Sequence, residues 1–288
     1  MFEGFTDTFI DTSGARIRVR HGGAGPPLLL LHGNPQTSAI WRHQAAALQD
    51  RFSLICPDLR GYGFSSKPPA GDNHINYSKR EMARDMVEVM EHLGHTHFGL
   101  VGHDRGGRVA HRLAYDWADR VSKIMVLDIA PTREMYAATT DAMARAYWHW
   151  FFMILPHPMP ERMMAADPDR FWMDKNSRQG DPAAFGEALD EYLEAFRNPE
   201  TLRGSCEDYR AAATIDIDHD NAETGKLTMP LRALWAKQGT VEKCCDALAL
   251  WRLRAEQVSG KALDCGHYMP EELPTEITAE IDQFFQDM

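Results

Sequence analysis

Short apolar runs alternate with amphipathic stretches up to residue 131, and this alternation restricts the possible folds more than any other feature of the sequence. The apolar runs lie at residues 27–33, 52–58, 97–104 and 123–131. Between them, apolar residues recur at helical spacing in 78–94 and 106–120. Buried strands that alternate with helices predict an α/β fold whose sheet is mostly parallel and covered by helices on both faces.

The pattern changes at residue 132. From 132 to 215 we find no convincing strand, and tryptophan, methionine and proline are frequent, as in RAYWHWFFMILPHPMPERMM. Alternation resumes with apolar runs at 230–236 and 257–267, which a helical stretch separates. We therefore expect a core formed by residues 1–131 and 216–288 and an all-helical cap at 132–215. Such an insertion usually covers the carboxyl ends of the strands, where open α/β sheets place their sites.

The composition argues against several classes of partner. The 288 residues carry a net charge of −11, which disfavours nucleic acid, because phosphate binding requires a basic face. The start of the chain lacks the features of a signal peptide, and no apolar run approaches the length that spans a membrane. The five cysteines indicate reduced thiols in a cytoplasmic protein, with a Cys244–Cys265 disulfide as the alternative. No glycine fingerprint or ligand cluster implies a cofactor or a metal.

The segment Gly102-His103-Asp104-Arg105-Gly106 separates a predicted strand from a predicted helix. Small residues around a central aspartate form the pattern of a nucleophile elbow, in which many hydrolases have serine. The small residues permit a sharp turn, and the positive end of the following helix favours an ionised carboxylate. The alternative is an aspartate that only caps this helix. Asp104 is therefore a candidate nucleophile whose partners must come from other segments.

Three other segments contain residues that a hydrolytic site needs. The HGNP turn at 32–35 follows an apolar run and can aim the Asn34 N–H, together with the Arg105 N–H, at an oxyanion. His267 follows the last apolar run, where it can reach the elbow. Asp128 ends the strand after the elbow helix and can hold the imidazole in the correct tautomer, although it can also be a simple turn or cap residue. Asp104, His267 and Asp128 thus form a candidate triad.

The segments HGNP, GHDRGGR, VLDIAP and DCGH, in this order, resemble the α/β-hydrolase fold family over nearly the whole chain. An aspartate at the elbow is similar to the dehalogenase and epoxide hydrolase branch, and GHDRGGR most resembles the fluoroacetate (haloacetate) dehalogenases. The resemblance implies that Arg105 and Arg108 hold a substrate carboxylate. It also implies that His149, Trp150 and Tyr209 bind the halide. A homodimer and a small anionic haloacid substrate are further implications of the same resemblance.

A carboxylate nucleophile suits attack on a saturated carbon, because it is ionised at pH 7 without help from a base. Asp104 would displace the halide to give an ester, and neutral His267 would then activate the water that hydrolyses this ester. The two arginines are three residues apart, so they project from one side of a helix, and a guanidinium matches a carboxylate in bidentate geometry. Alternatively, one or both pair with protein acids such as Glu134 or Asp141. We therefore expect a hydrolase that converts short 2-haloacids such as fluoroacetate and chloroacetate to 2-hydroxy acids.

One residue departs from the haloacetate dehalogenases, which tend to have an aromatic residue where this chain has Asn34. HGNP instead resembles the haloalkane dehalogenases, but those have tryptophan after the nucleophile, in place of Arg105. We follow Arg105, because a guanidinium disfavours neutral alkyl halides, and we leave the halide preference open. An epoxide hydrolase is the nearest alternative; it needs two cap tyrosines, for which the candidates are Tyr136, Tyr147, Tyr192 and Tyr209. A ligand-binding member of the family without enzymatic activity is the third.

Overall fold

The computed structural model describes all residues 1–288. The strands are β1 (Thr6–Asp11), β2 (Arg16–Gly23), β3 (Pro27–Leu31), β4 (Ser53–Pro57), β5 (Phe98–His103), β6 (Val121–Leu127), β7 (Leu231–Ala236) and β8 (Val258–Leu263). The α-helices are α1 (Arg42–Leu48), α2 (Lys79–His92), α3 (Arg105–Asp116), α4 (Thr132–Ala137), α5 (Asp141–Ala146), α6 (Trp148–Met153), α7 (Met159–Ala166), α8 (Pro168–Asn176), α9 (Leu189–Phe196), α10 (Pro199–Ala212), α11 (Ile215–Ala222), α12 (Thr240–Cys244), α13 (Ala247–Arg254), α14 (Met269–Glu272) and α15 (Pro274–Phe285). Short 3-10 helices are η1 (Ser38–Trp41), η2 (Asp72–Tyr77), η3 (Ala118–Arg120) and η4 (Pro182–Ala188).

All eight strands form one sheet in the order β1-β2-β4-β3-β5-β6-β7-β8. The pairs β1–β2 and β2–β4 are antiparallel, and the remaining pairs are parallel. β3 and β5 lie in the centre, where every residue of β5 is buried. The prediction of a mostly parallel sheet is confirmed, and the first two strands extend it as an antiparallel edge.

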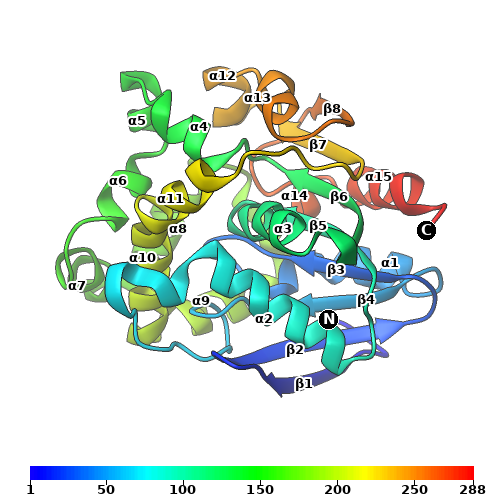
Figure 1. Ribbon diagram of the computed structural model, residues 1–288. Coiled ribbons are helices and arrows are strands. Elements are labelled where there is room, and N and C mark those ends of the chain that lie inside the picture. Colours follow the sequence, from blue (N-terminus) through cyan, green and yellow to red (C-terminus); the bar gives the residue numbers. More distant parts are fainter.

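Helices cover both faces of the sheet (Figure 1). Because side chains alternate along a strand, Leu29 and Leu31 face one layer of helices, whereas Leu28 and Leu30 face the other. The first layer packs α2, α3 and α13 against the sheet, and the second packs α1 and α15 against it. Each fully buried leucine contributes roughly 1.5–3 kcal/mol to folding. The two layers therefore hold the strands firmly, and the loops at the strand ends rest on a rigid support.

The segment Thr132–Ala222, between β6 and β7, consists of helices α4 to α11 and contains no strand. We call it the helical insertion. It encloses a core of its own, to which Trp150 and Trp172 contribute. That core also includes Ala130 and Tyr268, which follow β6 and β8, so the helical insertion lies at the carboxyl ends of the strands, on the left in Figure 1. The division into core and cap at residues 132 and 215 stays a prediction.

None of the helices combines the length and the apolar character that crossing a membrane requires. The five cysteines are free thiols, so no disulfide joins Cys244 to Cys265. No group of three or more histidine, cysteine or acidic side chains is arranged to hold a metal ion.

Candidate active site

Asp104 lies in the sharp turn between β5 and α3. Its φ of 47° and ψ of −115° lie in a sparsely populated region that strains the backbone of a residue with a side chain. The turn is tight, since a Cβ atom at Gly102 would lie 2.5 Å from the Gly106 carbonyl oxygen, and one at Gly106 would lie 2.4 Å from the His32 carbonyl oxygen. The Asp104 side chain makes no hydrogen bond that caps α3. The turn therefore does not use this carboxylate as a helix cap, which was the alternative role.

The Asp104 carboxylate is held in its ionised form. The backbone N–H of Asn34 donates a hydrogen bond of 2.9 Å to Asp104 Oδ1. This approach requires Gly33, because a Cβ atom there would lie 2.5 Å from the Asp104 Cβ. Burial alone raises the pKa of Asp104, but the imidazole of His267 and the guanidinium of Arg105 hold this pKa below its usual value. The Arg105 N–H, the predicted second oxyanion donor, belongs to the first residue of α3, and its role stays a prediction.

His267 and Asp128 form a hydrogen-bonded pair beside Asp104. His267 Nδ1 lies 2.6 Å from Asp128 Oδ2, and the Ala236 N–H donates a hydrogen bond of 2.9 Å to Asp128 Oδ1. The second imidazole nitrogen, His267 Nε2, lies 3.9 Å from Asp104 Oδ2. Burial lowers the pKa of His267, but the hydrogen bond and the charge of Asp128 raise it above its ordinary value. The structure thus brings the three residues of the candidate triad together, with Nε2 nearest the elbow.

Arg105 is bound along one edge to a protein carboxylate. Its Nε and Nη2 atoms lie 2.7 and 2.9 Å from the two carboxylate oxygens of Asp208, in α10. Asp208 also accepts hydrogen bonds from Tyr62, at 2.5 Å, and from Lys79. Arg105 Nη1 is buried without a partner. Arg105 therefore pairs with an acid that the sequence reasoning did not consider, and its Nη1 group remains available to a ligand.

Arg108 has no carboxylate partner, although only 3% of its surface is exposed. Its Nη1 donates hydrogen bonds to Thr132 Oγ1 at 2.8 Å and to the Ala130 carbonyl at 3.2 Å. Its Nη2 contacts only Met135 Sδ, at 3.7 Å, and its Nε has no partner. Burial and the charge of Arg105 lower the pKa of Arg108. No carboxylate faces the Nε–Nη2 edge, which can bind one in bidentate fashion, so this buried cation lacks a protein counter-ion.

Glu134 and Asp141, the acids considered as alternative partners of these arginines, are engaged elsewhere. Glu134 forms ion pairs of 2.7 Å with Arg133 and 2.8 Å with Arg254. Asp141 forms an ion pair of 2.8 Å with Arg145 in the exposed helix α5. Neither acid neutralises a charge beside the elbow.

His149, Trp150 and Tyr209 are buried around the two arginines. The guanidinium carbon of Arg105 lies 4.2 Å from the centre of the Tyr209 ring, and that of Arg108 lies 4.7 Å from the Trp150 ring. The ring centres of His149 and Tyr209 are 5.9 Å apart. Burial lowers the pKa of His149 well below its ordinary value, so the imidazole is neutral at pH 7. The structure thus gathers three side chains with N–H or O–H donors beside the two guanidinium groups.

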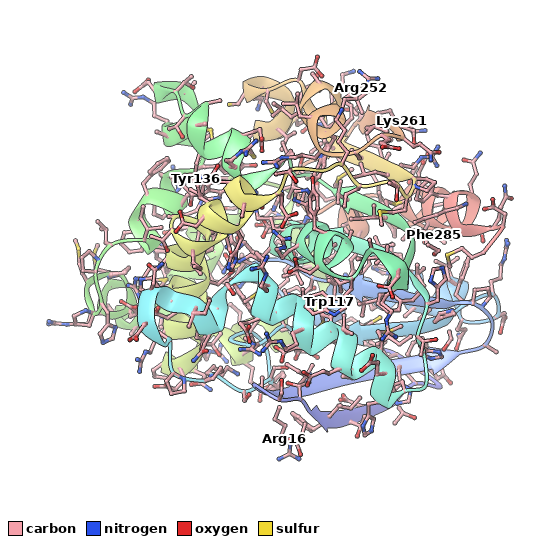
Figure 2. The ribbon with its side chains drawn as sticks, in the orientation of Figure 1. Arg16, Trp117, Tyr136, Arg252, Lys261 and Phe285 are labelled. Atoms are coloured by element: carbon pink, nitrogen blue, oxygen red, sulfur yellow. The ribbon has the colours of Figure 1, made fainter.

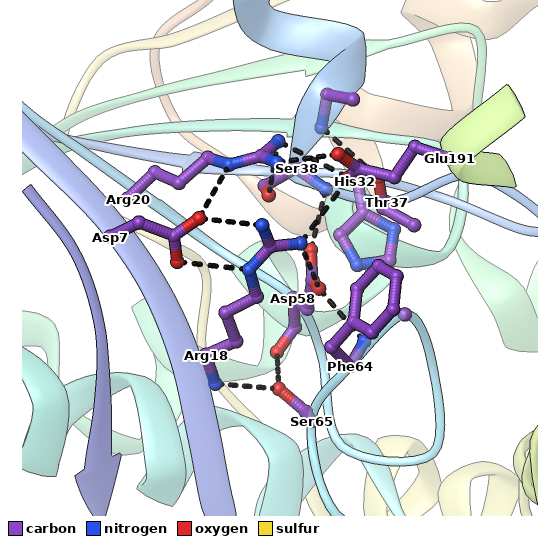
Figure 3. Close-up of polar contacts among 12 residues, drawn as sticks. Asp7, Arg18, Arg20, His32, Thr37, Ser38, Asp58, Phe64, Ser65 and Glu191 are labelled. Carbon is purple, nitrogen blue, oxygen red and sulfur yellow. Dashed lines mark hydrogen bonds and ion pairs between the residues drawn. The ribbon is translucent and has the colours of Figure 1, made fainter. Parts of the chain in front are cut away.

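A partly buried ion-pair network ties the helical insertion to the loop that contains Asn34 (Figure 3). Glu191 of α9 accepts hydrogen bonds from Thr37 Oγ1 at 2.6 Å and from Arg20 Nη2 at 2.5 Å. Arg18 approaches the same carboxylate at 3.4 Å. Because Thr37 belongs to the loop that begins after β3, the network fixes α9 against the loop whose Asn34 N–H group contacts Asp104.

A cavity of about 290 Å³ lies beside the candidate triad, and His267, Asp128 and His149 form part of its wall. The wall also contains Lys175 of α8, which the sequence reasoning missed. The signal for Lys175 is weak, because a lysine in the stretch FWMDKN is usually exposed to solvent. Asp208 was missed for a similar reason, although it directly precedes Tyr209 in the sequence.

Several known proteins with related sequences carry hydrolase names. The model for the family described as alpha/beta hydrolase fold matches residues 26–254. The chain is 40% identical to a fluoroacetate dehalogenase from Burkholderia sp., over 100% of this chain and 96% of that protein. It is 33% identical to a soluble epoxide hydrolase from Corynebacterium sp. (strain C12), over 95% of this chain and 94% of that protein. The crystal structure of a candidate alpha/beta hydrolase from Nostoc sp. PCC 7120 superposes with a TM-score of 0.98 at 48% identity, and 100% of each chain is covered.

Proposed function

The chain belongs to the α/β-hydrolase fold family, and from this premise we propose that it hydrolyses the carbon–halogen bond of short 2-haloacids. The proposed substrates are small anions such as fluoroacetate and chloroacetate, and the products are a 2-hydroxy acid and a halide ion. The observation that carries the proposal is Arg108, a buried guanidinium without a counter-ion beside the carboxylate of Asp104. A substrate carboxylate would supply the missing negative charge, which a neutral substrate cannot do.

In the first step, Asp104 attacks the carbon that carries the halogen, from the side opposite the halogen. A bond forms between a carboxylate oxygen of Asp104 and this carbon, while the carbon–halogen bond breaks and the halide leaves with the bonding electrons. His149, Trp150 and Tyr209 donate hydrogen bonds to the departing halide. Each well-placed donor contributes on the order of a hundredfold in rate, and fluoride needs such donors most.

During this step, the two guanidinium groups hold the carboxylate of the substrate. The Nε–Nη2 edge of Arg108 binds it in bidentate fashion, and Arg105 Nη1 adds one further donor. The other edge of Arg105 stays bound to Asp208, which keeps its guanidinium oriented before substrate arrives. Both positive charges also reduce the repulsion between the substrate and Asp104.

In the second step, water hydrolyses the ester. His267 Nε2 removes a proton from a water molecule, whose oxygen attacks the carbonyl carbon of the Asp104 side chain. Asp128 stabilises the resulting imidazolium through the contact of 2.6 Å with Nδ1. The Asn34 and Arg105 N–H groups stabilise the oxyanion. The bond between the carbonyl carbon and the ester oxygen, which came from Asp104, then breaks, and His267 returns the proton to this oxygen as the hydroxy acid departs.

An epoxide hydrolase with the same nucleophile is the second candidate function. Two tyrosine rings, those of Tyr147 and Tyr209, lie 5.8 and 5.9 Å from the His149 ring, so a pair of phenol groups borders the site. Such a pair could protonate an oxirane oxygen. This reaction, like that of a haloalkane dehalogenase, uses a neutral substrate and leaves Arg108 without a counter-ion. We therefore rank both below the haloacid reaction.

Halide release from fluoroacetate, chloroacetate and 1-chlorobutane, measured alongside the hydrolysis of styrene oxide, tests the proposal. We expect turnover of the two haloacids and none of 1-chlorobutane. The Asp104→Asn variant serves as the control and should release no halide. Turnover of the neutral substrates alone would overturn the proposal.

The proposal also includes a cytoplasmic location, which the free cysteines support, and a homodimer, which is supported only by the resemblance to the haloacetate dehalogenases. Sedimentation equilibrium of the purified protein distinguishes a dimer from a monomer of 32.6 kDa. A monomer at all concentrations would remove the dimer from the proposal without affecting the chemistry.

A further inference from the structure

The cavity beside His267 has a positively charged wall. Its cationic side chains are Arg145, Lys175, Arg178 and Lys243. Of these, only Arg145 forms an ion pair. The one carboxylate in the wall belongs to Asp128 and is already bound to His267. The chain as a whole has a net charge of −11, whereas the side chains around the cavity are mostly positive. The cavity therefore attracts anions.

Lys175 is the buried member of this set, with 3% of its surface exposed. Its ammonium has three donors and gives one hydrogen bond of 3.1 Å, to Asn176 Oδ1. Burial lowers the pKa of Lys175 to about 8, and the charge of Asp104 opposes this effect, so the ammonium is still protonated at pH 7. A buried cation with a single neutral partner is costly unless an anion joins it. No step of the reaction above uses Lys175.

The cavity and the arginine pair are separate parts of the site. The cavity wall contains neither Arg105 nor Arg108, but it contains His149 and His267, which the proposed reaction places beside the halide and the water. A volume of about 290 Å³ is at the small end of ligand pockets and exceeds what a two-carbon acid fills. Beside His149 and His267 the cavity therefore offers volume beyond that which a two-carbon substrate at the arginines needs.

We propose that this cavity binds a second anionic group of the substrate through Lys175, so that the preferred substrates are 2-halogenated dicarboxylic acids. This inference rests on the haloacid reaction proposed above and names its substrate class. The first carboxylate is held by Arg105 and Arg108, and the second extends into the cavity, where Lys175 donates to it. Gln179 in the same wall adds a neutral amide donor. The strongly hydrated ammonium of a lysine suits a carboxylate that enters together with water.

Two substrates of equal carbon number test the charge of the substituent. 2-Chlorosuccinate carries a second carboxylate where 2-chlorobutanoate carries a methyl group, and the remaining atoms are the same. We expect kcat/KM for 2-chlorosuccinate to exceed that for 2-chlorobutanoate by about tenfold or more, because one charge-assisted hydrogen bond is gained. Lys175→Gln should remove most of this preference, and Lys175→Arg should retain more of it than Lys175→Gln does.

The matched control is Lys261→Gln, which removes one positive charge at the β8 edge of the sheet. Figure 2 shows Lys261 near Arg252, well away from Tyr136 of the helical insertion. This side chain is 57% exposed and does not line the cavity. The control should leave the ratio of the two kcat/KM values unchanged.

Equal kcat/KM values for the two substrates in the unmodified enzyme would overturn the inference. It would also be overturned if Lys175→Gln lowered kcat/KM for chloroacetate as much as for 2-chlorosuccinate, because Lys175 would then serve anions in general. If no haloacid is turned over at all, the proposed function fails, and calorimetry still tests the cavity. Tighter binding of succinate than of butanoate, lost in Lys175→Gln, supports the second anion site, and equal binding excludes it.

Discussion

The replacement of Arg108 by methionine separates substrate binding from protein stability. Methionine preserves most of the length of the side chain over Trp150 and removes the charge. In the proposed complex, the Nε–Nη2 edge of Arg108, which otherwise contacts only Met135 Sδ, forms two charge-assisted hydrogen bonds with the substrate. Each is worth roughly 1.5–3 kcal/mol, or about 3–6 kcal/mol for the pair. Since each 1.36 kcal/mol is tenfold in rate, kcat/KM for chloroacetate should fall by about 10² to 10⁴.

Although kcat/KM should fall, Arg108→Met should not lower the stability of the protein appreciably. The variant loses hydrogen bonds to Thr132 and Ala130, but it also removes a buried charge that no protein carboxylate balances. We expect the free energy of unfolding to stay within about 1 kcal/mol of the parent protein or to rise. Arg105→Met is the matched comparison, because it breaks the buried pair with Asp208. Arg105→Met should lower the free energy of unfolding by about 3 kcal/mol. This value is at the low end for a broken buried ion pair, since Lys79 and Tyr62 still contact Asp208.

Chloride release gives the kinetics, and urea denaturation gives the free energy of unfolding. Glycolate, the product of chloroacetate, should raise the free energy of unfolding of the parent protein, and this effect should be absent in Arg108→Met. The reasoning is refuted if Arg108→Met keeps kcat/KM for chloroacetate within about threefold. It is equally refuted if the loss of stability matches that of Arg105→Met, because Arg108 would then have a structural role.

Three other predictions concern the remaining groups of the site. His267→Asn should still form the ester, because the Asp104 carboxylate is ionised without a base. Mass spectrometry should then detect a carboxymethyl group retained on the enzyme after reaction with chloroacetate. Rapid glycolate release without this adduct would contradict the separate roles of Asp104 in ester formation and His267 in ester hydrolysis. Only neutral His267 accepts a proton, and its pKa is raised above the ordinary histidine value of about 6.5. As the pH is lowered, the rate of ester hydrolysis should therefore begin to fall while the pH is still above about 6.5. A rapid-quench measurement that finds no dependence on pH would argue against His267 as the base. Asp208→Asn should reduce the free energy of unfolding by about 3–5 kcal/mol, since Arg105 and Lys79 lose their shared carboxylate. The same change should raise KM for chloroacetate. An unchanged KM in a stable variant would show that Asp208 does not position Arg105.

The elements that local sequence patterns predicted agree closely with the structure. The expected strand at 97–104 is β5 at Phe98–His103, and the expected helix at 78–94 is α2 at Lys79–His92. The proximity of Asp104, Asp128 and His267 was also predictable, because the carboxyl ends of parallel strands meet at one edge of a sheet. For these features, chain order and periodicity contain enough information.

The partners of Arg105 and the burial of Lys175 could not be predicted in this way. The Arg105–Asp208 contact joins residues 103 positions apart, and it depends on the tertiary position of α10, which no local pattern specifies. Lys175 is buried in the wall of the cavity, whereas its own residue type favours exposure. In both cases, tertiary packing determines the environment of a charged group.

The contact between Arg105 and Asp208 also limits how such enzymes can be recombined. The elbow helix α3 contains Arg105, whereas Asp208 is part of the helical insertion, so the two halves of one ion pair lie on either side of the boundary at which a chimera would be joined. A graft of this insertion onto a core without the arginine would bury an acid that still has Lys79 but has lost its bidentate partner. The reverse graft, of an insertion without the acid, would bury Arg105 without its carboxylate partner, next to Asp104. Productive chimeras in this family should therefore exchange both residues together, even when the donor and acceptor share the same nucleophile.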